Sequence, residues 1–337
     1  MEAAGRGLWL AMLIMIMATG EGEGRLSESF YDLTCPDVES IVHQAVAKKA
    51  NQTFITIPGT LRLFFHDCFC SMIKRDLVVS ISQGCDASIM IGAPGSEKDA
   101  PINLSLEGDA FDIVIKSKTA VEAVCPGVVS CADIMAIAAR DVVVLAGGPS
   151  WEVELGRRDG LVSNASLVED RLPPPNFNLT QLNALFAKNN LTQFDMIALS
   201  GAHTLGATHC DTFMLSRLYN YSNSSHVDPS LNRTYAKKLI QACPKNVDPN
   251  VVVALDNLTP EAFDNAYFQD LIGGRGVLSS DEVLFTDPAS RPTVRAFAGD
   301  PGLFSRAFAT AMIKLGRVGV LTGNQGQIRK DCTAFNS

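Results

Sequence analysis

The chain has 337 residues, a formal net charge of −8, 47% hydrophobic residues and 19% charged residues. These values exclude collagen-like, low-complexity and coiled-coil proteins, and the length suffices for one large domain or two lobes that share a cleft. The acidic net charge and the scattered basic residues argue against nucleic acid as a partner.

The N-terminus predicts export from the cell. Arg6 precedes an unbroken apolar run over residues 8–18, and small and acidic residues follow at 19–24. A bilayer span needs roughly 20 apolar residues, so a cleaved signal peptide over residues 1–24 is favoured over a retained membrane anchor. We therefore expect residues 25–337 to form a secreted, extracellular protein without a membrane segment.

Helical patterning dominates the predicted secondary structure. Only residues 150–155 alternate like a strand. The sequence therefore predicts a mostly α-helical fold, in which the proline-rich segment 172–175 joins two halves. The predicted helices cover residues 39–50, 58–67, 128–146 and 192–201, begin again at Pro260, and cover residues 306–316.

One acidic residue, Asp133, lies inside the predicted helix 128–146, which is apolar on nearly every face. A buried carboxylate without a partner is very costly. We therefore expect an ion pair with Arg157 or Arg158, which follow Gly156.

Export also determines how the cysteines and asparagines are interpreted. In an oxidising compartment, nine cysteines favour disulfides over metal-bound thiolates, and the odd number leaves at least one cysteine unpaired or paired outside the chain. The Asn-x-Ser/Thr sequons predict a heavily glycosylated surface. They begin at Asn51, Asn103, Asn164, Asn178, Asn190, Asn220, Asn223, Asn232 and Asn257.

Arg62 and His66 are the first candidates for chemistry. They lie four residues apart on one predicted helix, so both side chains project from the same face, next to Phe65. A fixed positive charge keeps a neighbouring imidazole neutral, as a general base requires, and it can stabilise charge that develops on a substrate oxygen. The alternative interpretation is a capped helix end with a surface histidine.

His203 is the second candidate. It lies in Ser200-Gly201-Ala202-His203-Thr204-Leu205-Gly206, where the small residues permit a flat or bulky group to approach the backbone. A satisfied core histidine explains this segment equally well. The His-Glu-x-x-His, Gly-x-Ser-x-Gly and Gly-Lys-Ser/Thr motifs are missing from the sequence, which argues against a zinc protease, a serine hydrolase and a P-loop.

Two oxygen-rich clusters accompany the histidines. Hard oxygen ligands in such numbers suit Ca²⁺ outside the cell, although helix caps explain the second cluster equally well. The first cluster is Asp67, Gly84, Asp86 and Ser88, and the second is Thr204, Asp256, Thr259 and Asp264.

Taken together, these motifs resemble those of the secretory plant (class III) haem peroxidases. The resemblance extends from Phe30 to Cys332 and includes eight of the cysteines. It implies an all-α fold over residues 25–337, in which two lobes with minor β content enclose one haem. The matching segments are Leu61-Arg62-Leu63-Phe64-Phe65-His66-Asp67-Cys68-Phe69, Gly84-Cys85-Asp86-Ala87-Ser88 and the segment around His203.

The resemblance implies a role for each matching residue. His203 would ligate the haem iron, and Asp281 would accept the other ring N–H of this histidine. On the opposite, distal side, His66 would take a proton from hydrogen peroxide and return it to the leaving oxygen. Asn103 would hold His66 in the required tautomer, which leaves its sequon unused, and Arg62 would stabilise negative charge on the peroxide.

The implied reaction reduces hydrogen peroxide and oxidises phenolic donors in successive one-electron steps. The implied setting is a monomer in the cell wall or apoplast, active in phenolic and lignin chemistry and in the response to oxidative stress. Pro173 and Phe65 are the implied substrate-binding residues. The implied cofactors are haem b and two Ca²⁺ ions, one in each oxygen cluster. The resemblance also implies the pair Asp133–Arg157 and the disulfides Cys35–Cys125, Cys68–Cys85, Cys131–Cys332 and Cys210–Cys243.

The sequence departs from this family at residues 70–82, an insertion that contains the ninth cysteine, Cys70. The longer loop costs about 1.2 kcal/mol in closure entropy, so the bridge between Cys68 and Cys85 can survive. The insertion puts the distal calcium, that of the first oxygen cluster, in doubt, and Cys70 can compete with Cys68 for Cys85. It is either a surface loop or a mis-spliced or mispredicted exon edge.

Two rival functions follow from the insertion and the export signal. The first is a non-catalytic secreted haem-binding glycoprotein, whose distal site is disrupted by residues 70–82. The second is a structural wall glycoprotein without haem, which leaves the two histidines unexplained.

Overall fold

The architecture is that of a computed structural model, which describes residues 25–69, 84–106 and 108–337. The predicted signal peptide and the insertion with Cys70 lie outside these residues. Within them, no helix is both long enough and apolar enough to cross a membrane.

Helices dominate the described residues, which confirms the predicted all-α fold. The two strands described, β1 (Ala207–His209) and β2 (Val252–Ala254), pair antiparallel with Ala207 opposite Ala254. The α-helices are α1 (Val38–Ala50), α2 (Thr56–Phe69), α3 (Gly108–Glu122), α4 (Cys131–Leu145), α5 (Leu179–Ala187), α6 (Gln193–Ser200), α7 (Cys210–Met214), α8 (Arg233–Ala242), α9 (Ala266–Ile272), α10 (Ser279–Thr286), α11 (Arg291–Gly299) and α12 (Pro301–Leu315). The short elements are the 3₁₀ turns η1 (Ser88–Met90), η2 (Glu97–Asp99), η3 (Pro101–Asn103), η4 (Ala165–Leu167) and η5 (Gly201–Thr204) and the π turn η6 (Leu215–Tyr219).

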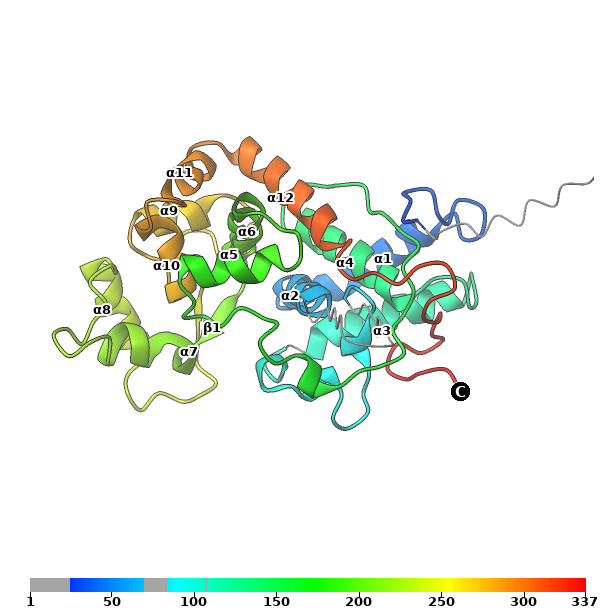
Figure 1. Ribbon diagram of the computed structural model, residues 1–337, viewed down its shortest axis with the longest axis horizontal. Helices are drawn as coiled ribbons and strands as arrows, with labels where there is room; N and C mark the ends of the chain where they lie inside the picture. Colours follow the sequence, from blue (N-terminus) through cyan, green and yellow to red (C-terminus); the bar gives the residue numbers. More distant parts are fainter. Residues whose placement is uncertain (1–24, 70–83, 107) are drawn as a thin grey trace, which may run out of the picture.

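The helices form two lobes (Figure 1). Helices α1 to α4 pack on one another in the first lobe, and α5, α6, α9, α10 and α11 group in the second. Helix α12 packs on α6 and α11 and extends toward the first lobe. Helices α7 and α8 lie beside the second lobe around a small apolar cluster of their own. The proline-rich segment 172–175 connects η4 to α5 and so joins the lobes, as predicted.

Local capping explains where the helices begin. A capping box begins α6, because the Thr192 hydroxyl accepts from the Asp195 amide and the Asp195 carboxylate accepts from the Thr192 amide. Helix α4 begins at Cys131, later than expected, because the Ser130 side chain caps it by accepting from the Asp133 amide. Helix α12 begins at Pro301, earlier than expected, after the cap residue Asp300.

Two predicted elements are wrong. Residues 260–265 form turns and bends, and α9 begins only at Ala266. The amide of Phe263 donates to the Ala146 carbonyl and the amide of Ala266 donates to the Asp264 carboxylate, so these groups are not available to a helix. Residues 150–155 form no strand either, since Leu155 makes only an isolated bridge to Ser27.

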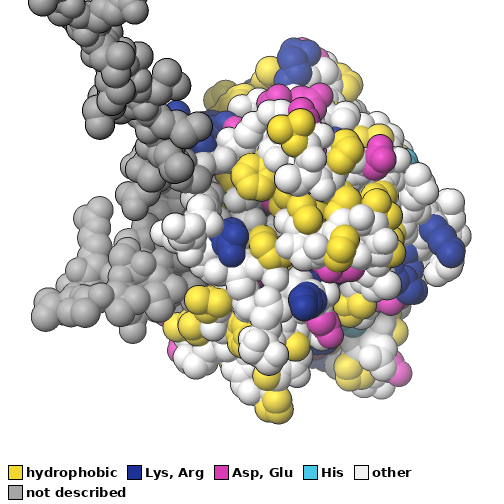
Figure 2. Space-filling view, turned by 90° about the vertical axis from the view of Figure 1, so that its right-hand side faces the viewer, with side chains coloured by type: hydrophobic (Ala, Val, Ile, Leu, Met, Phe, Trp, Pro, Cys, Tyr) yellow, Lys and Arg dark blue, Asp and Glu magenta, His cyan; other side chains and the backbone are white. Residues whose placement is uncertain are grey.

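The four disulfides implied by the resemblance are bonded in the structure. Cys131–Cys332 ties the start of α4 to the C-terminal segment, and Cys68–Cys85 ties the end of α2 to the residues that follow the insertion. The surface shown in Figure 2 intersperses apolar and polar side chains, with Lys and Arg lying apart from one another rather than in a stripe.

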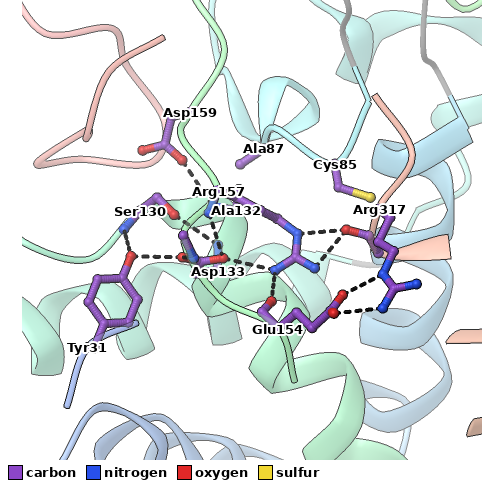
Figure 3. Close-up of polar contacts among 12 residues, drawn as sticks. Tyr31, Cys85, Ala87, Ser130, Ala132, Asp133, Glu154, Arg157, Asp159 and Arg317 are labelled. Atoms are coloured by element: carbon purple, nitrogen blue, oxygen red, sulfur yellow. Dashed lines mark hydrogen bonds and ion pairs between the residues drawn. The ribbon is translucent and has the colours of Figure 1, made fainter. Parts of the chain in front are cut away.

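A buried polar network centres on Asp133 (Figure 3). Asp133 is fully buried and pairs with Arg157 at 2.9 Å, as predicted. Its carboxylate also accepts from the Tyr31 hydroxyl (2.8 Å) and the Gly156 amide (2.7 Å). The Arg157 Nε and Nη2 atoms donate to the Gly316 carbonyl at the end of α12. The network therefore fastens α12 to the first lobe.

Replacing Asp133 tests this fastening. Asp133→Ala leaves the Arg157 guanidinium buried without a carboxylate, and we expect the free energy of unfolding to fall by about 3–5 kcal/mol. Glu154→Gln is the control, because Glu154 pairs with the half-exposed Arg317 and should contribute less than about 1 kcal/mol. Urea unfolding with the disulfides intact measures both, and equal losses would contradict the central role of Asp133.

Candidate active site

Helix α2 presents Arg62 and His66 on one face. Leu61, Leu63 and Phe64 are buried, and they bind α2 to its neighbours α3 and α4. Arg62 is exposed although the residues on either side of it are buried, while His66 is 6% exposed. The helix is thus anchored by its apolar residues and holds both polar side chains at the other face.

Asn103 fixes the orientation and tautomer of His66. The Asn103 Nδ2 donates to the Glu97 carbonyl (2.8 Å), so its Oδ1 faces His66 and lies 2.7 Å from His66 Nδ1. Nδ1 must therefore carry the ring proton, which leaves the lone pair on Nε2. Asn103 is 2% exposed, and its amide nitrogen is engaged, which agrees with an unused sequon.

Burial and charge keep His66 neutral. Burial lowers the pKa of His66 first, and the positive charge of Arg62 lowers it further, to about 3. The hydrogen bond with Asn103 opposes this shift without reversing it. A neutral imidazole with a free Nε2 can accept a proton throughout the physiological pH range.

Ser105 holds the Arg62 guanidinium, a contact that no sequence pattern predicts. Arg62 Nη1 donates to the Ser105 carbonyl (2.9 Å), and Nη2 donates to the Ser105 hydroxyl (3.0 Å). Both acceptors lie just beyond η3, the turn that carries Asn103. One turn therefore positions both His66 and Arg62.

His203 lies in η5 of the second lobe and pairs with Asp281 in the first turn of α10. Its Nδ1 lies 2.9 and 3.1 Å from the two Asp281 carboxylate oxygens. Burial lowers the pKa of His203, but the negative charge of Asp281 and this hydrogen bond outweigh burial and raise it overall. Nδ1 is the donor, so Nε2 is again the unengaged ring nitrogen.

Arg62 influences both histidines. Burial has the larger effect on each pKa, and the positive charge of Arg62 lowers the pKa of His66 and of His203, so the three side chains act on one region of the molecule. The His203 side chain is 38% accessible. An imidazole oriented by a carboxylate, together with a neutral imidazole beside a guanidinium, fits the haem that the sequence implies.

The two implied substrate-binding residues lie in different elements. Phe65 packs edge-on against His66 and stacks on Phe69. Pro173 is partly buried in the segment that joins the lobes. The carbonyl of Pro175 in that segment accepts from the Ser280 amide (2.9 Å), next to Asp281.

The first oxygen cluster is buried and brings several carboxylates close together. Burial raises the pKa of Asp67, Asp86 and Glu97, that of Asp86 to about 6, and the charge of Asp86 raises the other two further. One oxygen of Asp86 and one of Glu97 have no hydrogen-bond partner. Ser88 donates to Glu97 (3.0 Å), and the Gly84 carbonyl accepts from the Asp86 amide (2.6 Å). Orphaned, buried carboxylate oxygens fit a divalent cation, and Glu97 is a member that the sequence did not reveal.

The second oxygen cluster is held together by hydroxyl groups. Thr204 Oγ1 donates to Asp256 (2.9 Å), and Thr259 Oγ1 donates to Asp264 (3.1 Å). The Ala262 carbonyl also lies 3.4 Å from Thr204 Oγ1. Asp264 also accepts from the amide of Ala266, the first residue of α9, which agrees with the interpretation as a helix-end cap. Among the described residues, no group of three or more His, Cys, Asp or Glu side chains could hold a metal, so both clusters need hydroxyl or carbonyl ligands.

Gly201 makes room for aromatic rings. A Cβ atom at this position would overlap the Phe304 ring and lie 3.0 Å from Phe268. The absence of a side chain at Gly201 therefore allows the packing that seats η5 on α9 and α12.

A pair of glycine substitutions tests the seating of η5. Gly201→Ala should lower the free energy of unfolding by about 1–3 kcal/mol through overpacking. Gly299→Ala is the matched control, because a Cβ there meets nothing within 4 Å, and it should be neutral or stabilise by about 0.4–1 kcal/mol. Urea unfolding compares them, and an unchanged midpoint for Gly201→Ala would refute the tight fit.

Comparisons with known proteins agree with this geometry. Residues 38–300 match the family described as peroxidase. Peroxidase 51 of Arabidopsis thaliana is 54% identical over 98% of this chain and 98% of its own length. Peroxidase 73 of the same plant is 55% identical over 93% of this chain and 92% of its own, and Peroxidase 45 is 51% identical over 96% of each.

These matches extend over nearly the whole chain and confirm the family resemblance. They do not favour the non-catalytic glycoprotein. The chain belongs to the peroxidase family, as a haem peroxidase of the plant (class III) type that reduces hydrogen peroxide with electrons from a reducing substrate.

Proposed function

We propose that His66 and Arg62 carry out the proton and charge chemistry of peroxide reduction, while His203 ligates the haem iron from the other side. The observation that carries this assignment is that the surroundings of the two imidazoles shift their pKa values in opposite directions. Burial and Arg62 keep His66 neutral, whereas Asp281 holds the Nδ1 proton of His203. The first arrangement suits a base, and the second suits a strongly donating ligand.

Haem, when bound, supplies the redox centre at which hydrogen peroxide accepts two electrons. His203 offers Nε2 to the iron, and Asp281 fixes the ring orientation through Nδ1. η5 is seated by the packing of Gly201, so the ligand is held by a rigid turn.

The distal residues act in sequence on the peroxide proton. His66 Nε2 would take a proton from one oxygen of hydrogen peroxide and deliver it to the other oxygen, which would leave as water. Asn103 keeps Nδ1 protonated so that Nε2 remains the acceptor. Arg62 stabilises the negative charge that develops as the O–O bond breaks, and Ser105 holds the guanidinium in place.

We further propose that the reducing substrates are small phenols, which bind near Pro173 and Phe65 and each give up one electron. The position of the 172–175 segment supports this, because its Pro175 carbonyl is bonded to the start of α10, the helix that carries Asp281. The proposed enzyme is a secreted, glycosylated monomer of the cell wall or apoplast. Apart from the buried Asn103, the sequon asparagines are exposed and accessible to glycosylation.

We also propose one Ca²⁺ ion in each oxygen cluster. In the first oxygen cluster, a cation is supported by the unpartnered oxygens of Asp86 and Glu97 and by the mutual repulsion of the carboxylates. Asp67 is the residue after His66, so this ion would stabilise the end of α2. In the second oxygen cluster, Thr204 follows His203 directly, so the second ion would stabilise η5.

Removing the charge of Arg62 tests the assignment of His66 as the base. In the wild type the pKa of His66 is about 3, so the rate constant for reaction with hydrogen peroxide should fall only in strong acid. In Arg62→Leu this pKa rises, and the fall moves to higher pH, but it stays below the ordinary histidine range because burial remains. The rate constant itself should drop by about 10²–10³-fold.

Stopped-flow absorbance across a pH series measures both effects. Arg306→Leu, which removes an exposed arginine on α12, should change neither. An acid limb that stays in place in Arg62→Leu would show that His66 is not the titrating base.

Calcium removal tests the two cation sites. At calcium concentrations 100-fold above Kd, each site adds about 2.7 kcal/mol to stability, so a chelator should lower the unfolding midpoint. Asp86→Asn should be less stable than the wild type in calcium and more stable in chelator, because it relieves the repulsion among the buried carboxylates. Asp112→Asn, at a partly exposed site paired with lysine, should respond to calcium like the wild type. Identical midpoints with and without calcium would exclude both sites.

A further inference from the structure

A buried tyrosine shares the carboxylate that orients His203. The Tyr267 hydroxyl donates to Asp281 Oδ1 at 2.9 Å, and His203 Nδ1 lies 2.9 Å from the same oxygen. Tyr267 is 1% exposed and Asp281 is 3% exposed, so water does not compete for this oxygen. The peroxide chemistry derived above does not use Tyr267.

Packing aims the hydroxyl at Asp281. Tyr267 lies in α9, which packs on α10 and η5, the elements that carry Asp281 and His203. Its ring stands edge-on to His203 at 6.1 Å and to Phe268 at 5.0 Å. Burial, together with the charge of Asp281, raises the pKa of Tyr267 well above its usual range, so the hydroxyl remains a donor at every working pH.

The charge of Asp281 has few other partners. Within residues 25–69, 84–106 and 108–337, no arginine or lysine forms an ion pair with Asp281, and the hydrogen bonds to its carboxylate come from His203 and Tyr267. Arg217, which lies near the adjacent Glu282, is instead engaged by Asp228 and by the Gly276 carbonyl. The two donors therefore share one negative charge.

We propose that Tyr267 is a positioning residue of the peroxidase reaction, which draws charge from Asp281 and thereby limits how strongly His203 donates to the haem iron. This proposal rests on the proposed ligation of iron by His203. A hydrogen bond to a carboxylate in a dry interior takes up part of its charge, so the carboxylate pulls less on a second donor. The Tyr267 hydroxyl thus tunes the ligand through the residue that orients it.

Removing this hydroxyl should change the donor strength of His203 in the direction opposite to that caused by removing the carboxylate charge. In Tyr267→Phe, Asp281 accepts from His203 alone and pulls its proton more strongly, so His203 becomes the stronger donor. We expect the ferric/ferrous potential of the haem-loaded protein to become more negative and the iron–histidine stretch of the ferrous protein to rise in frequency. Asp281→Asn should shift both quantities the other way. Redox titration and resonance Raman spectroscopy measure them.

Matched variants separate this effect from a structural one. Tyr31→Phe removes an equally buried tyrosine hydroxyl from Asp133 in the other lobe, and it should cost stability without moving either spectroscopic quantity. In the Asp281→Asn background, Tyr267→Phe should shift the potential far less than in the wild type. A shift that persists there in full, an unmoved potential and stretch in Tyr267→Phe, or shifts in the Asp281→Asn direction would each overturn the proposal.

One control tests separately whether His203 ligates the haem iron. An iron–histidine band that is present in the wild type and lost in His203→Ala establishes the ligand. A wild-type ferrous protein without this band would overturn the ligation of iron by His203 and, with it, the role of Tyr267. A band that is present but does not respond to Tyr267→Phe overturns the role of Tyr267 alone.

Discussion

The site depends on one constraint, which is that a hydrogen bond engages one ring nitrogen on each of two histidines. His66 Nδ1 donates to Asn103, and His203 Nδ1 donates to Asp281, so both rings keep Nε2 unengaged. The acceptors differ in charge, and this difference separates the roles. A neutral amide leaves His66 neutral, with a pKa that burial and Arg62 hold low, whereas a carboxylate makes an imidazole such as His203 a stronger electron donor.

The rest of the fold supplies the rigidity that these hydrogen bonds require. The first lobe anchors α2 by its apolar residues, and the second lobe seats η5 through Gly201 against aromatic rings. The buried pair of Asp133 and Arg157 fastens α12, which packs on the second lobe, to the first. Because the two histidines belong to different lobes, any loosening between the lobes alters their alignment. The chemistry proposed for the two histidines therefore depends on the packing between the lobes.

Much of this arrangement was predictable from the sequence, for reasons that differ between residues. Arg62 and His66 were found by helical spacing, and the partner of Asp133 by the cost of a buried charge. The motifs around His66, Gly84 and His203, together with eight cysteines, indicated the family, and with it Asn103 and Asp281. Local pattern failed at Pro260, where hydrogen bonds to Asp264 and Ala146 replace the first helical turn. Contacts between distant segments, such as Ser105 with Arg62 or Tyr267 with Asp281, have no local signature and required the structure.

The most direct test of the account mixes the haem-loaded protein with hydrogen peroxide and follows the resting haem band by stopped-flow absorbance. The account predicts a fast second-order conversion in the wild type. His66→Ala should keep its haem and slow the conversion by about 10²–10⁴-fold, whereas His203→Ala should fail to hold haem normally. A His66→Ala variant that reacts as fast as the wild type, or a His203→Ala variant with an unchanged haem spectrum, would contradict the division of roles between the two histidines.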